Sequence, residues 1–70
     1  MELRDYLKIL DPAAREALAA ASATTLGYLY QLAGGHRLPS AHLCNRLEAA
    51  SDGQVTREEL RPDLFLRQSA

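Results

Sequence analysis

The sequence predicts an all-α fold: a compact five-helix domain that spans residues 1–70. Apolar residues recur at helical spacing, and no segment alternates convincingly between apolar and polar residues as a strand would. Residues that begin or end helices stand between these segments. Alanine is abundant between positions 13 and 23, which favours helix and close helix packing. A chain of 70 residues is long enough for one domain with a small core.

The first two helices are predicted on either side of an Asp-Pro pair. The apolar residues before this pair recur at helical spacing: Leu3, Tyr6, Leu7 and Leu10. They predict an amphipathic helix from Glu2 to Leu10. Asp11 is a favourable N-cap and Pro12 suits the first position of a helix, so a second helix should run from here to about Ala21.

The third helix is expected after Ser22-Ala23-Thr24, which interrupts the apolar pattern. We expect Thr24 to cap it, and its apolar residues are Leu26, Leu29 and Leu32. Gly34-Gly35 should end it, because glycine readily adopts the left-handed conformation that helix ends require.

Two further helices are predicted after the loop His36 to Pro39. Ser40 should cap a fourth helix, which carries Leu43 and Leu47 and ends near Asp52-Gly53. The spacing of Thr56 and Glu59 is that of a capping box, so a short fifth helix should begin there and end at Pro62. Arg61 and Asp63 are expected to fix the turn that follows.

Composition and spacing argue against several classes of protein. The lone Cys44 cannot form an internal disulfide, so we expect it to be buried as a small apolar residue. No apolar stretch approaches membrane-spanning length and no signal peptide is recognisable, so we expect a cytoplasmic protein with no membrane partner. No arrangement typical of an enzyme or of cofactor binding is present, and His36, His42 and Cys44 lack the spacing of a metal site.

Charge is unevenly distributed along the chain, although the net charge is only −1. Between Ala17 and Leu47 there is no acidic residue, and this window holds His36, Arg37, His42 and Arg46. A surface without acidic residues suits phosphate binding. The same window is equally compatible with apolar core segments that are simply poor in charge.

The second and third helices, joined by a tight turn, predict a DNA-binding helix-turn-helix from roughly Arg15 to Gly35. Ala19 supplies the small residue where the two helices touch. Branched apolar side chains line the inner faces: Leu18, Leu29 and Leu32. The turn requires a residue that tolerates positive φ, and Ser22 or Ala23 must serve. An alanine in that conformation costs roughly 1 kcal/mol relative to glycine.

The outer face of the third helix is the predicted DNA-reading surface. Its residues and the threonine before them are Thr24, Thr25, Leu26, Gly27, Tyr30 and Gln31. Thr25 stands where hydroxyls and backbone N–H groups meet phosphate, and Gln31 can pair with an adenine edge. Gly27 permits a close approach of its backbone, either to DNA or to another helix. Outside this face, the predicted phosphate contacts are Arg15, His36 and Arg37.

Three segments resemble one group of prophage regulators: GYLYQLAGGHRLPS, LCNRLEAAS and VTREELRPDLF. This is the Cro-like YdaS group, also described as antitoxins, and the resemblance extends from the LRDYLKIL start to Phe65. More distantly, TTLGYLYQLAGG is similar to the recognition region of lambda-type repressors. The resemblance implies a compact five-helix, lambda-repressor-like fold. It also implies binding to a double-stranded DNA operator, control of transcription and a homodimer. The sequence departs from the group at Ala23, Tyr30 and Cys44, where glycine, a small polar residue and alanine are usual.

An alternative function is that of an antitoxin or antirepressor that mainly binds a toxin or repressor protein. It depends on the apolar patch Leu64-Phe65-Leu66. We expect Leu64 and Phe65 to close the core, whereas Leu66 is freer to join a homodimer or to receive a partner.

Overall fold

The computed structural model describes residues 1–65, and this part of the chain contains five helices. They are α1 (Leu3–Ile9), α2 (Pro12–Ala21), α3 (Leu26–Ala33), α4 (Ala41–Ala50) and α5 (Arg57–Leu60). This part of the chain contains no strand, so the all-α prediction is confirmed for it. No helix within it is both long enough and apolar enough to cross a bilayer.

Side chains cap four of the five helices at their N-termini. As predicted, Asp11 accepts the Ala14 N–H at 2.7 Å at the start of α2, and Ser40 caps α4. Thr56 and Glu59 form the predicted capping box of α5. The prediction that Thr24 caps α3 is wrong, because the cap is Thr25, whose hydroxyl accepts the Tyr28 N–H at 3.1 Å. Thr24 belongs instead to the turn that ends α2.

The C-terminal ends of α2, α3 and α4 share one hydrogen-bond pattern, the Schellman motif. After α2, the N–H groups of Ala23 and Thr24 donate to the carbonyls of Ala20 and Ala19, each at 3.0 Å. The motif requires a residue with positive φ, and three different residue types fill that position: Ala23 (φ 59°), Gly35 (φ 80°) and Asp52 (φ 57°). Of the two residues predicted to adopt this conformation after α2, Ala23 does so and Ser22 (φ −92°) does not.

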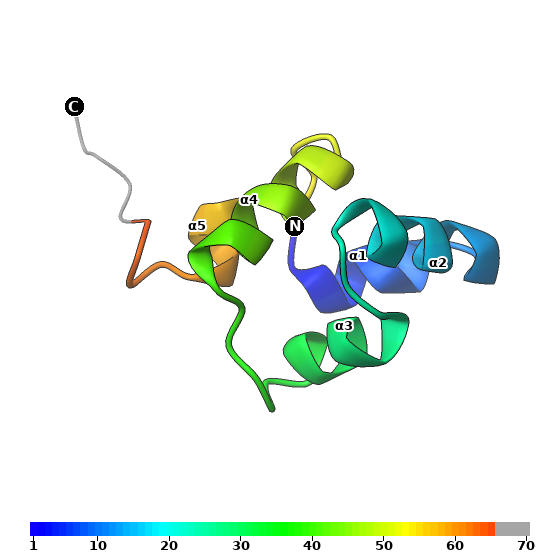
Figure 1. Cartoon of the computed structure of the whole chain (residues 1–70), viewed down its shortest axis with the longest axis horizontal. Helices are drawn as coiled ribbons and strands as arrows, with labels where there is room; N and C mark the ends of the chain where they lie inside the picture. The colour runs from blue at the N-terminus through cyan, green and yellow to red at the C-terminus, as the bar shows by residue number, and fades with distance from the viewer. Residues whose placement is uncertain (66–70) are drawn as a thin grey trace.

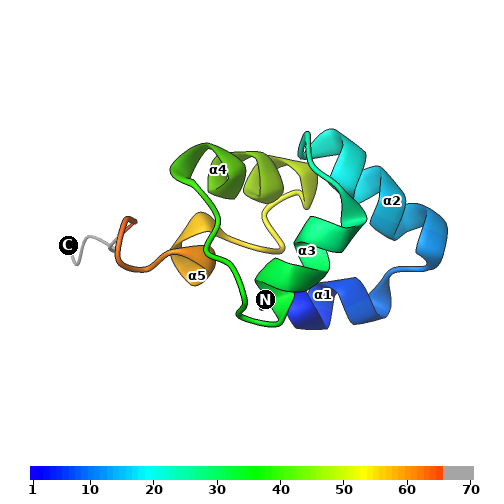
Figure 2. The same ribbon diagram turned by 60° about the horizontal axis from the view of Figure 1, so that its bottom comes forward.

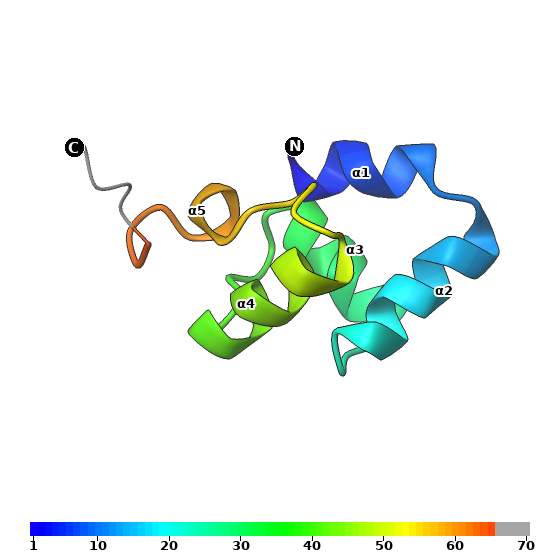
Figure 3. The same cartoon turned by 90° about the horizontal axis from the view of Figure 1, so that it is seen from above.

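The core lies where α2, α3 and α4 meet, with α1 packed against α3 (Figure 1). Its most deeply buried members are Leu29, Cys44, Leu47 and Val55, all fully inaccessible to solvent. The expected burial of Cys44 is confirmed, and this burial raises the pKa of its thiol. Seen from above, α1 runs along one side of the molecule, and α2 and α4 lie on the other (Figure 3).

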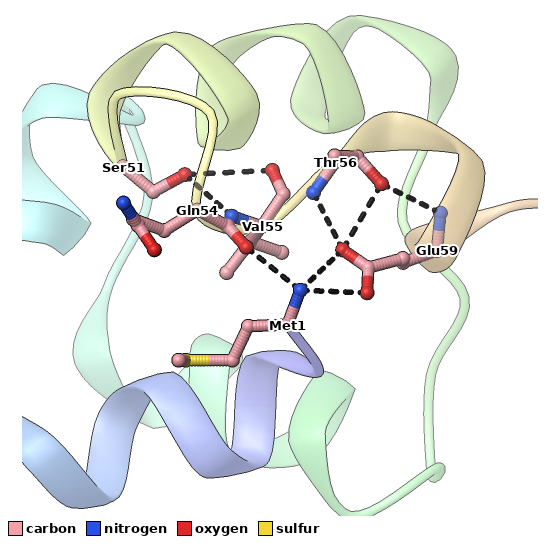
Figure 4. Close-up of polar contacts among 6 residues, drawn as sticks. All are labelled: Met1, Ser51, Gln54, Val55, Thr56 and Glu59. Carbon is pink, nitrogen blue, oxygen red and sulfur yellow. Dashed lines mark hydrogen bonds and ion pairs between the residues drawn. The ribbon is translucent and has the colours of Figure 1, made fainter.

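The start of the chain is tied to α5 (Figure 4). The Met1 ammonium group lies 2.6 and 2.7 Å from the two carboxylate oxygens of Glu59, and it donates to the Gln54 carbonyl at 2.8 Å. Glu59 also accepts the Thr56 N–H at 3.0 Å through the capping box. One carboxylate therefore joins the start of α1 to the start of α5.

The turn after α5 is held by Arg61, as predicted. Its guanidinium pairs with Asp63 through two contacts of 2.9 and 2.7 Å and donates to the Pro39 carbonyl at 2.9 Å. The prediction that Leu64 closes the core is wrong, because its side chain is 50% exposed. Val55 and the partly buried Leu60 already close this side of the core. The same prediction for Phe65 is also wrong, because this half-buried side chain lies against the Arg57 guanidinium and is not part of the core. Leu66 lies outside the described residues.

Candidate nucleic-acid interface

Helices α2 and α3 pack directly against each other, joined by residues 22–25. The buried side chains of their inner faces are those expected from the sequence: Leu18, Ala19, Leu29 and Leu32. Figure 1 shows α3 at one edge of the molecule, and Figure 2 brings that edge forward. The packing leaves the opposite face of α3 open to solvent.

This open face of α3 carries Gly27, Tyr30 and Gln31, all exposed. Tyr30 is 47% exposed, so its ring and hydroxyl are accessible from solvent. A Cβ atom at position 27 would meet no other atom within 4 Å. Close packing against another helix among residues 1–65 therefore does not explain Gly27. The face is uncharged and has a notch where Gly27 lacks a side chain.

Two predicted members of the reading face lie partly inside the fold. Leu26 is half-buried and packs against the core, so only part of its side chain faces outward. Thr24 is half-buried, and its N–H is used by the turn that ends α2. Thr25 is exposed at the N-terminus of α3, and its cap satisfies the Tyr28 N–H. The Leu26 and Gly27 N–H groups have no hydrogen-bond acceptor within the described part of the chain.

The three predicted phosphate contacts outside the α3 face differ in their surroundings. Arg15 on α2 is half-buried, and its Nε–H donates to the Leu7 carbonyl at 2.7 Å. His36 and Arg37 are exposed in the loop after α3. This loop is held at both ends. The His36 N–H donates to the Gln31 carbonyl at 2.9 Å, and the buried Pro39 accepts from Arg61.

Two exposed cations beside α3 were not predicted from the sequence. Arg4 and Lys8 stand one turn apart on α1, and they line a cleft that also includes Arg15 and Tyr30. Arg4 also lines a second cleft, which includes Arg37. The spacing of Arg4 and Lys8 places them on one face of α1. Only the packing of α1 against α3 brings that face beside Tyr30.

The histidines and the cysteine of the middle segment do not form a site together. Cys44 is buried in the core, whereas His36 and His42 are exposed. Across residues 1–65, no group of three or more metal-ligating side chains is placed to hold an ion.

Comparison with protein-family models and with curated proteins gives no match for this chain. Function is therefore inferred from the geometry of α2 and α3 and from the cations beside them.

Proposed function

We propose that the protein binds double-stranded DNA sequence-specifically and regulates transcription as a Cro-like repressor of the YdaS type. In this proposal α2 and α3 act as a helix-turn-helix, and α3 enters the major groove. The observation that carries the proposal is the open, uncharged face of α3 at the edge of the molecule, bordered by cations. The Gln31 amide and the Tyr30 phenol on this face can form hydrogen bonds to base edges or phosphates.

Specificity would come from few side chains. Gln31 can form two hydrogen bonds to an adenine edge, which would discriminate by about 1–3 kcal/mol. Its exposure leaves the amide free for this contact. The notch at Gly27 lets the backbone of α3 approach the bases. Thr25, the exposed part of Leu26 and Tyr30 would complete the reading face.

Affinity would come from phosphate contacts at the edges of this face. Arg37 and His36 extend from a loop held at both ends, and the free N–H groups at the start of α3 favour an anion. The face itself carries no positive charge, so one domain alone would bind weakly. We therefore propose a homodimer on a two-fold operator, with each α3 in one half-site.

The decisive experiment is a titration of the purified protein with DNA from upstream of its own gene and with random DNA. Specific binding should be at least about 10³-fold tighter and should weaken steeply with salt. Gln31→Ala should relax preference at one base pair, whereas Arg37→Ala should weaken binding to every sequence. The matched controls are Gln54→Ala and Arg46→Ala, which change exposed residues of the same types outside the interface. Equal binding of upstream and random DNA by the wild type would refute the proposal.

The exposed Leu64 favours a second function, that of an antitoxin or antirepressor which binds a partner protein. The side chain of Leu64 is 50% exposed, and an exposed apolar side chain contributes to a protein interface when it belongs to a larger apolar patch. For this function, the titration would show no preference for upstream DNA, and a toxin or repressor partner would form a complex of defined mass.

A further inference from the structure

A cleft of about 210 Å³ lies between α1, α2 and α3. Leu7 and Ala33 contribute its apolar surface. The surface of the cleft is almost wholly apolar, and the other residues that line it come from three different helices: Arg4 and Lys8 of α1, Arg15 of α2, and Tyr30 of α3. Three cationic side chains and one tyrosine therefore border a single apolar cleft beside the open face of α3.

None of these three cations is neutralised by the described part of the protein. The ion pairs among residues 1–65 involve Met1, Arg57 and Arg61 as the positive partners, and none involves Arg4, Lys8 or Arg15. Arg4 and Lys8 are one helical turn apart, where like charges repel each other. An anion bound between them would relieve this repulsion.

Arg15 is held in a fixed position at this cleft. Its Nε–H donates to the Leu7 carbonyl, which lies in the last turn of α1, where a cation is favoured. The remaining N–H groups of its guanidinium have no hydrogen-bond acceptor within residues 1–65. The side chain is thus oriented by one hydrogen bond while its other donors stay available for a ligand.

Tyr30 connects this cleft to the proposed reading face, because it belongs to both. Arg4 connects it to the loop after α3, because Arg4 also lines the second cleft with Arg37. The second cleft contains the carboxylates of Glu2 and Glu59, and Glu59 is paired with the Met1 ammonium. Arg15, Arg4 and Arg37 therefore border the two clefts beside α3, together with the carboxylate of Glu2 in the second cleft.

We infer that the α1–α2–α3 cleft binds the sugar-phosphate backbone of the DNA strand beside the groove that α3 enters. This inference rests on the proposed DNA-binding function. Arg4, Lys8 and Arg15 would contact phosphates, and the Tyr30 hydroxyl would donate to the same strand. The apolar surface of the cleft suits a deoxyribose. When α3 lies in a groove of the duplex, the sugar-phosphate backbone at the edge of that groove passes beside this helix. The position of α3 therefore favours DNA over an acidic peptide as the ligand of the cleft.

The test compares Arg4→Gln, Lys8→Gln and the double variant with Arg46→Gln, an exposed α4 cation outside both clefts. Fluorescence anisotropy would measure binding to upstream and to random duplex DNA between about 50 and 200 mM salt. Each lost contact should lower the slope of log affinity against log salt by about 0.9. Each variant should also weaken binding to both DNAs by the same factor. Arg46→Gln should match the wild type, and unchanged thermal unfolding would show that every variant is folded.

The possible outcomes separate this inference from the proposed function. If the wild type binds upstream DNA specifically while Arg4→Gln and Lys8→Gln both match Arg46→Gln, the cleft is not a backbone site but the proposed function stands. If the wild type does not bind DNA, both fail. A poly-glutamate peptide that binds the wild type as tightly as duplex DNA, and loses affinity in the same variants, would assign the cleft to an acidic protein segment and overturn the inference.

Discussion

The hydroxyl group of Ser51 bridges both backbone groups of Val55. Its oxygen accepts the Val55 N–H at 3.0 Å and lies 3.4 Å from the Val55 carbonyl and 3.2 Å from that of Glu48, to either of which it can donate. This arrangement closes the turn between α4 and α5 inside the protein (Figure 4). Ser22, at the end of α2, is equally buried, yet its hydroxyl has no hydrogen-bond partner within residues 1–65.

The two buried serines should therefore respond differently to the same substitution. Ser51→Ala leaves the buried Val55 N–H without an acceptor and should cost about 1–3 kcal/mol of unfolding free energy. Ser22→Ala removes an unsatisfied buried hydroxyl, so stability should be unchanged or rise by up to about 1 kcal/mol. Urea unfolding followed by circular dichroism measures both, and each variant is the control for the other. Equal losses would show that the Ser22 hydroxyl does form a hydrogen bond in solution.

Replacing Ala23 with glycine should stabilise the protein. Ala23 has φ 59°, a conformation that costs an alanine roughly 1 kcal/mol and costs glycine little. We expect Ala23→Gly to raise the melting temperature by several degrees. Gly35 occupies the equivalent position after α3, with no atom within 4 Å of where a Cβ would stand. Gly35→Ala should therefore lower stability by a similar amount, and a fall in both variants would contradict the prediction.

Substitution of Gly27 should separate folding from DNA binding. A Cβ at this position meets nothing within 4 Å, and alanine favours helix over glycine by about 0.5–1 kcal/mol. Gly27→Ala should therefore stabilise α3 in thermal unfolding. If the bare backbone lies against DNA, the same variant should bind upstream DNA more weakly in the anisotropy titration. A variant that is more stable and binds as well as the wild type would remove Gly27 from the proposed contact surface.

The Met1–Glu59 contact should give stability a specific pH dependence. The pKa of the Glu59 carboxylate is lowered from its usual 4.5. The larger cause is the hydrogen bond from the Met1 ammonium group, and the next is the hydrogen bond from the Thr56 N–H. A carboxylate whose pKa is lower in the folded state contributes its stability above the unfolded pKa, and this contribution is lost as pH falls through the folded pKa.

Glu59→Gln should consequently be less stable than the wild type at neutral pH, and the difference should shrink below about pH 4.5. Exposed ion pairs contribute up to about 1 kcal/mol, which sets the expected scale. Unfolding midpoints measured from pH 7 to pH 3 would test this. Glu16→Gln, which changes an exposed glutamate with no ion pair in the described structure, is the control. A pH-independent difference would contradict this account.

Local chemistry explains which parts of the fold were predictable from the sequence. Asp11, Ser40 and Thr56 each cap a helix with their own side chains, and that property is readable from neighbouring residues. Thr24 and Thr25 could not be distinguished in this way, because both are good N-caps. The Schellman motif after α2 decides between them by using the Thr24 N–H.

Features that depend on packing between distant segments were not predictable. The exposure of Leu64 depends on whether Val55 and Leu60 have already filled the core. Likewise, the position of Arg4 and Lys8 beside Tyr30 depends on how α1 crosses α3. The exposure of Gly27, Tyr30 and Gln31 on α3 was therefore predictable, whereas the neighbouring cations of α1 were not.

The loop between α3 and α4 is held by hydrogen bonds at both of its ends, at His36 and at Pro39. A segment anchored in this way has little backbone freedom left to lose when a ligand binds. Association through Arg37 would then incur a small conformational entropy cost and resemble the docking of two rigid surfaces. The heat-capacity change of DNA binding would then reflect only the apolar area buried between protein and DNA. It would be smaller in magnitude than the change for a loop that folds when it binds.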